Sequence, residues 1–204
     1  MSLEYLFDQV SRGRTLIFDL DNTIYPESEF LFGVYSQISA IANPKLSSEI
    51  FNFLKTTFLL EGREDLFGKL IHKFPESRIS KALCLDIMRS YKPPQKIKPF
   101  VWFNKLIYQV NKSFVLRIVT NGNVAQQRNK INSIDFRLSS NRIEVVYANQ
   151  TKPKPAPDSF LNFKNANNFI EPIYIGDSFI DFEYANNLGI EYVDSNNLAS
   201  KEFI

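Results

Sequence analysis

Thr15-Leu-Ile-Phe-Asp-Leu-Asp-Asn-Thr23 is a short apolar run that ends in acidic, amide and hydroxyl residues. Its first part, residues 15–20, follows a Gly-Arg pair and is almost wholly apolar, which is typical of a buried strand. A strand without alternating polar residues suits a parallel sheet that is covered on both faces. The stretch therefore predicts one strand of an α/β core, with Asp19 and Asp21 at its carboxyl end.

Further apolar segments of the same kind follow along the chain and alternate with helix-like segments. Strands are expected at residues 114–119, 143–147, 173–175 and 190–193, and helices at 124–134, 158–168 and 179–188. Gly189 directly follows the last of these helices, where glycine is the usual stop. This alternation predicts an α/β fold with a doubly wound parallel sheet, a Rossmann-like core.

The interval between the first two strands breaks this alternation, because it reads as helices only. Helical patterns cover residues 46–60, 66–74 and 79–91, and a proline-rich segment follows at 92–99. We predict a small α-helical cap domain at 26–91, inserted into a core domain made of 1–25 and 92–204. The alternative is one long crossover that packs on the sheet.

Composition limits the possible chemistry. The 204 residues have a net charge of +2, one histidine and one cysteine. Cys84 alone excludes an internal disulfide framework and suits a reducing cytoplasm, and a Ser-His-Asp triad would have to use His72. No basic stripe or membrane-length apolar run occurs, so neither nucleic acid nor a membrane is expected as a partner. An enzyme of this composition would rely on carboxylates, lysine, hydroxyls and a hard metal ion.

Polar residues with chemical potential stand where the predicted strands end. In open α/β sheets, ligands bind beyond the carboxyl ends of the strands, and helix N-termini there favour anions. The segments are Asp19-Leu-Asp21, Thr120-Asn121-Gly122, Lys152-Pro-Lys154-Pro, and Gly-Asp177-Ser-Phe-Ile-Asp181. Each is unremarkable alone, but their coincidence predicts one site.

These segments, in this order, resemble the motifs of the haloacid dehalogenase-like (HAD) hydrolase superfamily: D-x-D-x-T, a strand-end Ser/Thr, a lysine commonly in K-P-x-P, and G-D-x-x-x-D. The resemblance runs from about residue 15 to 194 and places the helical interval where this family carries its cap. The residues after Asp21, and Gln127 with Lys130, resemble the phosphatase and nucleotidase-like branches. Dehalogenase members lack the second aspartate of the first motif, so Asp21 favours phosphate-ester chemistry.

The resemblance implies a role for each motif residue. Asp19 would be the nucleophile and Asp21 the general acid and then base, with a raised pKa expected among neighbouring carboxylates. The implied catalytic residues are Asp19, Asp21, Thr120 and Lys154, and the implied substrate-binding residues are Thr120, Asn121, Gly122 and Lys154. Mg²⁺ would be held by Asp19, Asp21 through its backbone carbonyl, Asp177, and Asp181 directly or through water.

Two lysines compete for the motif position. Lys154 begins K-P-x-P-x-x-F, which is the usual register of the family, whereas Lys152 begins K-P-K-P and misplaces the aromatic residue. We therefore favour Lys154, with Lys152 as the alternative.

The function expected from these features is a Mg²⁺-dependent phosphatase that hydrolyses a small phosphomonoester metabolite through an aspartyl-phosphate. One alternative is a phosphomutase with the same intermediate. Another is a non-catalytic binding or regulatory module on the same fold.

Overall fold

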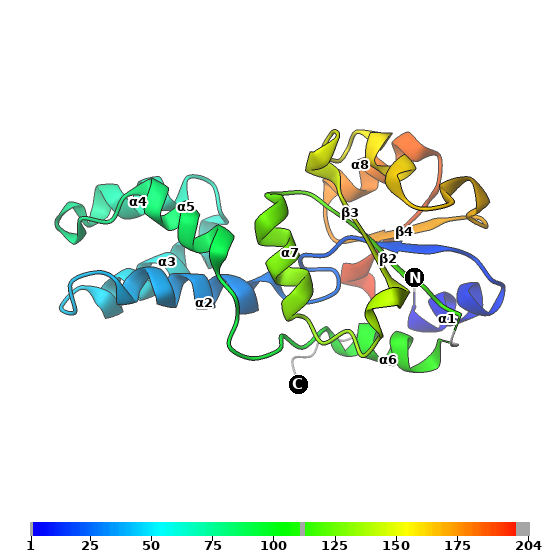
Figure 1. Cartoon of the computed structure of the whole chain (residues 1–204), viewed down its shortest axis with the longest axis horizontal. Coiled ribbons are helices and arrows are strands. Elements are labelled where there is room, and N and C mark those ends of the chain that lie inside the picture. Colours follow the sequence, from blue (N-terminus) through cyan, green and yellow to red (C-terminus); the bar gives the residue numbers. More distant parts are fainter. Residues whose placement is uncertain (1, 111–112, 199–204) are drawn as a thin grey trace.

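A five-stranded sheet lies at the centre of the core in the computed structural model, which describes residues 2–110 and 113–198. All neighbouring strands are parallel, in the order β3-β2-β1-β4-β5 (Figure 1). The strands are β1 (Leu16–Phe18), β2 (Leu116–Thr120), β3 (Ile143–Tyr147), β4 (Ile173–Gly176) and β5 (Glu191–Asp194). The predicted doubly wound sheet is confirmed.

Helices cover both faces of this sheet because its strands carry apolar side chains on both sides. Leu16 and Phe18 of β1 belong to one buried cluster and Ile17 to another, as the two-residue repeat of a strand requires. The first cluster includes residues of helices α1 (Leu3–Ser11), α6 (Val101–Gln109) and α7 (Val124–Ser133), and the second includes residues of α8 (Phe179–Leu188). Both faces are therefore withdrawn from water, as expected for a parallel sheet.

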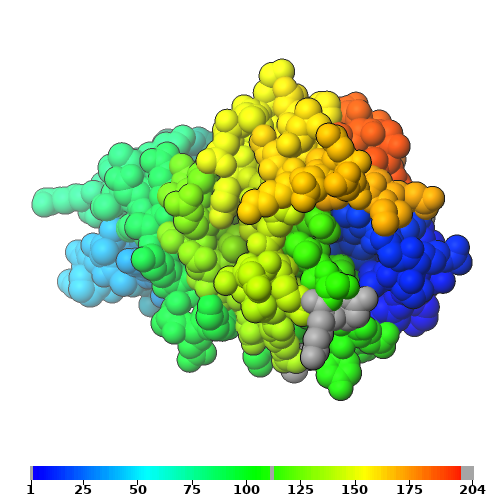
Figure 2. All heavy atoms as spheres, turned by 45° about the vertical axis from the view of Figure 1, so that its right-hand side comes forward, coloured from blue at the N-terminus to red at the C-terminus, as the bar shows by residue number. Residues whose placement is uncertain are grey.

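The helix expected at residues 158–168 is wrong. That stretch forms short 3₁₀ segments at Pro157–Asn162 and Ala166–Asn168, separated by Phe163 in an extended conformation and Asn165 with a positive φ of 57°. The aromatic spacing that resembles a helical repeat instead brings Phe160, Phe163 and Phe169 into mutual ring contact. Figure 2 shows this segment (yellow to orange) on the surface of the core, away from the cap helices (cyan to green).

Four of the helices between β1 and β2 project from one side of the sheet (Figure 1), whereas α6, which follows them, packs on the sheet. The four are α2 (Glu27–Ala40), α3 (Ser47–Glu61), α4 (Leu66–Lys73) and α5 (Lys81–Ser90). Gly62 ends α3 with a φ of 77°, a conformation that favours glycine. We call these four helices and their connections the cap.

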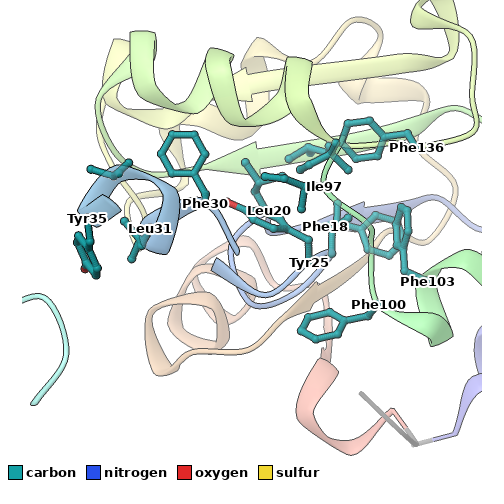
Figure 3. Packing of buried hydrophobic residues seen from close by; sticks show 14 of the residues in the cluster. Phe18, Leu20, Tyr25, Phe30, Leu31, Tyr35, Ile97, Phe100, Phe103 and Phe136 are labelled. Carbon is teal, nitrogen blue, oxygen red and sulfur yellow. The ribbon is translucent and has the colours of Figure 1, made fainter. Parts of the chain in front are cut away.

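Buried apolar side chains continue from the sheet into the cap without a break. Phe18, Tyr25, Phe30 and Leu31 belong to one cluster, which Figure 3 shows at the base of α2. The division into 1–25 with 92–204 and 26–91 stays a prediction, and residues 1, 111, 112 and 199–204 of it lie outside the described chain.

The sheet order positions the site. The chain moves from β1 to β2 and β3 on one side, and then returns to place β4 on the other side of β1. A crevice is expected where the order reverses, beyond the carboxyl ends of β1 and β4. Asp19 follows β1 and Asp177 follows β4, so both lie at this position.

Candidate active site

Three carboxylates meet beyond the ends of β1 and β4. One carboxylate oxygen from each of Asp19, Asp177 and Asp181 lies within 4.8 Å of the others. They line a cavity of about 230 Å³ together with Asp21 and Lys154. The backbone N–H of Asp19 donates to the carbonyl of Ile175 at 2.8 Å, which continues the β1–β4 pairing up to the site.

Lys154 is the lysine that reaches these carboxylates. Its Nζ lies 2.5 Å from Asp19 Oδ1, 2.6 Å from Asp181 Oδ1 and 2.8 Å from the Tyr174 hydroxyl. Burial lowers the pKa of the Lys154 ammonium, but Asp19 and Asp181 outweigh burial and hold it above its usual value. Lys152 is 69% exposed and pairs with Asp158 instead.

The loop after β2 holds Lys154 in place. The Asn121 side chain accepts a hydrogen bond from the Lys154 backbone N–H at 2.8 Å and donates one to its carbonyl at 3.0 Å. Thr120 is buried and lines the cavity, as does Asn121. Gly122 is not among the lining residues, because the turn with its φ of 119° directs its N–H to Asn149 Oδ1 at 2.7 Å. Of the expected phosphate-binding residues, the structure thus brings Thr120, Asn121 and Lys154 together.

Asp181 occupies the first turn of α8. Ser178 caps this helix: its Oγ accepts from the Asp181 N–H at 3.3 Å and donates to Asp181 Oδ2 at 2.6 Å. Asp177 therefore precedes the cap residue and lies outside the helix that carries Asp181. The two carboxylates meet because Gly176 leaves room: a Cβ there would lie 2.5 Å from Asp181 Cβ.

Asp21 faces a lysine. Both of its oxygens lie 2.8 Å from Lys130 Nζ, and it accepts further hydrogen bonds from the Tyr25 hydroxyl at 2.6 Å and from Gln127 at 3.0 Å. Burial raises the pKa of the Asp21 carboxyl, but Lys130 and these hydrogen bonds outweigh burial and hold it below its usual value. The expected raised pKa is wrong for this arrangement, because a buried cation stands where only carboxylates were foreseen.

Glu27 joins this group to the cap. Its Oε1 accepts from Lys130 Nζ at 2.8 Å and from Arg63 Nη1 at 2.7 Å. Burial and Asp21 raise the pKa of the Glu27 carboxyl, while Lys130 and Arg63 lower it. A continuous series of charged contacts therefore runs from Asp21 through Lys130 and Glu27 to Arg63, which lies in the loop after α3.

The sequence gives little sign of this series of charged contacts. In the sequence, Lys130 belongs only to the family-like pattern with Gln127, which implies no role for it. Glu27 and Arg63 lie in no motif, and they reach the site only because α2 and the loop after α3 fold back towards it. Asn22 supports this geometry: its side chain accepts from the Glu27 N–H at 3.1 Å at the start of α2.

Replacing Lys130 by methionine is expected to destabilise the protein strongly. The side chain is fully buried, so its loss leaves Asp21 and Glu27 without their shared cation. Breaking such a buried pair costs about 3–5 kcal/mol, against about 0–1 kcal/mol for an exposed pair. Urea unfolding measures the difference, with Lys69→Met at the exposed Lys69–Glu61 pair as the matched control. Equal losses in the free energy of unfolding in both variants would contradict a structural role for this series of charged contacts.

Asp19 is buried among groups that have opposite effects on its ionisation. The pKa of the Asp19 carboxyl is raised to about 8, because burial, Asp181 and Asp21 together raise it by more than Lys154 lowers it. Thr23, fully buried, donates to Asp177 at 3.3 Å and links the loop after β1 to the loop after β4. A carboxylate that faces a lysine and two acidic neighbours has the groups required for nucleophilic catalysis with a bound cation.

Comparison with known proteins places this geometry in context. A family model described as haloacid dehalogenase-like hydrolase matches residues 16–194. No curated protein matches the chain.

Solved structures share the fold at low sequence identity. The HAD-type hydrolase YfnB of Bacillus subtilis, solved with bound magnesium, has a TM-score of 0.58 and 18% identity, over 88% of this chain and 85% of that one. A protein assigned as a phosphoglycolate phosphatase from Lactobacillus plantarum has a TM-score of 0.53 and 21% identity, over 88% and 84%. A protein assigned as a β-phosphoglucomutase from Thermotoga maritima has a TM-score of 0.51 and 16% identity, over 89% and 84%.

Proposed function

Because the chain belongs to the haloacid dehalogenase-like hydrolase family, we propose that it is a Mg²⁺-dependent phosphatase that cleaves a small phosphomonoester through an aspartyl-phosphate on Asp19. The observation that carries the proposal is the contact of Lys154 with Asp19 inside a cluster of carboxylates, with Asp21 two residues away. An anionic nucleophile can approach an anionic phosphate only where cations offset the repulsion.

The residues around the cavity fit a hard divalent cation. Carboxylates outnumber cationic side chains in the lining, where Asp19, Asp21, Glu27, Asp177 and Asp181 face Arg63 and Lys154. Asp19 and Asp177 would hold Mg²⁺ with the backbone carbonyl of Asp21. Asp181 would act through water, because its two oxygens already accept from Lys154, Tyr174 and Ser178. The cation would supply charge neutralisation and favour the ionised form of Asp19.

The chain's own residues would carry the proton and phosphoryl transfers. Asp19 attacks phosphorus and the ester P–O bond breaks, with the leaving alcohol taking a proton from Asp21. Water then loses a proton to Asp21 as it attacks the aspartyl-phosphate, which releases inorganic phosphate and restores Asp19. Donation to the alcohol requires Asp21 to leave Lys130 first, because that contact favours the ionised form.

Phosphoryl oxygens would be bound by the groups nearest Asp19. Lys154 supplies charge, and the Thr120 hydroxyl and the backbone N–H of Asn121 would supply donors. Asn121 would act mainly by holding Lys154 through its paired backbone hydrogen bonds.

The proposal includes a small soluble substrate and a location in the cytoplasm, as expected from the sequence. No helix in the described ranges has the length and apolarity needed to cross a bilayer. Cys84 is a buried free thiol, which fits the reducing cytoplasm that we propose.

Phosphate release from a panel of phosphomonoesters tests the proposal. We expect turnover with Mg²⁺, its loss on addition of EDTA and its recovery when excess Mg²⁺ is restored. An isomerised product without free phosphate would indicate a phosphomutase. Absence of turnover on every ester, together with Mg²⁺-dependent thermal stabilisation, would favour a binding module.

A further inference from the structure

A second cavity, of about 510 Å³, lies within the cap. Its wall is largely apolar and includes Leu31 and Tyr35 of α2, Phe67 of α4, and Leu85 and Met88 of α5. We call it the cap cavity. Its size and composition match those of sites for small organic ligands, which are typically about 300–1,000 Å³ with few polar groups.

The cap cavity adjoins the catalytic cavity. Arg63 lines both of them. Glu27, Leu31 and Tyr35 follow one another at four-residue spacing along one face of α2, where Glu27 lines the catalytic cavity and the other two line the cap cavity. Figure 3 shows Leu31 and Tyr35 on this helix, where both belong to the buried cluster.

Tyr35 provides a polar group in this apolar wall. It is 1% exposed, and its hydroxyl makes no hydrogen bond to any residue in the part of the chain that the structure describes. The hydroxyl is not among the fully buried polar atoms that lack a partner, and Tyr35 lines the cavity, so the hydroxyl can donate to an acceptor that a ligand supplies there. Burial and the nearby Glu27 raise the pKa of the Tyr35 hydroxyl, which therefore stays protonated and able to donate.

The catalytic cavity is too small for a whole metabolite. Its volume of about 230 Å³ lies below the usual range for ligand pockets, and its lining is mainly charged. The phosphoryl group and a cation suit such a space, whereas the alcohol part of an ester must extend outside it. The cap cavity lies on the side of Arg63, which lines both cavities.

We propose that the cap cavity binds the leaving alcohol, and that the substrates are phosphomonoesters of a predominantly apolar alcohol with a hydrogen-bond acceptor that Tyr35 reaches. This inference rests on the proposed phosphatase function. Arg63, released from Glu27 or shared with it, would contact the ester at the junction of the two cavities. Lys81 and Asp65 also line this cavity, but they form an exposed ion pair with each other, with Lys81 Nζ 2.7 Å from Asp65 Oδ1, and leave the interior apolar.

A series of n-alkyl phosphates tests the apolar part, because its longer members have leaving groups of nearly equal pKa. We expect kcat/KM to rise about fourfold per added methylene until the cavity is filled. A flat or falling series, with the short esters still hydrolysed, would overturn the inference and leave the phosphatase proposal intact. Hydrolysis of no ester at all would instead overturn the phosphatase proposal itself.

Filling the cavity should abolish this chain-length dependence. Met88→Trp places a larger side chain in the wall. We expect kcat/KM to stop rising with alkyl length in this variant, while methyl phosphate is still hydrolysed. Leu83→Trp is the matched control, because Leu83 lies on the same helix but is 41% exposed and does not line the cavity. Equal slopes in both variants would contradict the assignment, with unfolding temperatures showing that both are folded.

Tyr35→Phe tests the polar part. Wild type should prefer a keto-alkyl phosphate over the alkyl ester of equal length. In the variant, the ratio of kcat/KM for the keto ester to that for the alkyl ester should fall by about fivefold. An unchanged ratio between the two esters would remove Tyr35 from substrate recognition.

Discussion

Asp19→Asn is expected to reduce kcat by at least about 10⁴-fold, the scale on which loss of a nucleophile acts in other hydrolases. The amide keeps the size of the side chain but cannot form the acyl-phosphate. The fold should survive, because Lys154 retains its contact with Asp181 at 2.6 Å. Phosphate release under saturating ester and Mg²⁺ measures the effect.

Asp158→Asn is the matched control for this variant, since Asp158 pairs with an exposed lysine away from the carboxylate cluster. It should retain wild-type turnover. Mass spectrometry of acid-quenched wild type should also detect a phosphoryl group on the peptide that contains Asp19. Activity of Asp19→Asn above a tenth of wild type would exclude the aspartyl-phosphate route.

Lys154→Met is expected to impair both turnover and stability. The ammonium is the cation between Asp19 and Asp181, so its removal leaves two buried carboxylates facing each other. We expect kcat/KM to fall by about 10²–10³-fold, as for loss of one transition-state charge contact. The free energy of unfolding should fall by about 3–5 kcal/mol without Mg²⁺, as for other broken buried pairs.

Lys152→Met separates the two lysines of the proline-rich segment. Lys152 is 69% exposed, so its loss should change the free energy of unfolding by less than about 1 kcal/mol and leave turnover unchanged. Initial rates and urea unfolding of both variants measure the contrast. A larger loss of turnover in Lys152→Met than in Lys154→Met would reverse our choice of active-site lysine.

Local pattern was a good guide where a strand is buried on both faces. The runs around Phe18 and Ile175 are continuous and apolar, so they were recognised as strands and lie next to each other in the sheet. The same approach failed at residues 158–168, where Phe160 and Phe163 mimic a helical repeat. Backbone breaks at Phe163 and Asn165 decide that segment, and neither is visible in hydrophobic periodicity.

The site was foreseen at its motif positions and missed elsewhere. Asp19, Lys154 and Asp181 follow from strand-end placement and family resemblance, and their side chains touch. The pKa of Asp21 was expected in the wrong direction, because Lys130 lies more than a hundred residues away in the chain. Such a distant cation leaves no mark on the local sequence around the first motif.

The sequence by itself determined the parallel α/β core and the gathering of Asp19, Asp177 and Lys154 beyond the strand ends, since buried strands and their polar ends are local properties of the chain. Only the tertiary structure decided that Lys130 lies between Asp21 and Glu27 as their shared cation, and that Arg63 also pairs with Glu27. Burial and charge contacts set the pKa values there, and both depend on which distant segments pack together.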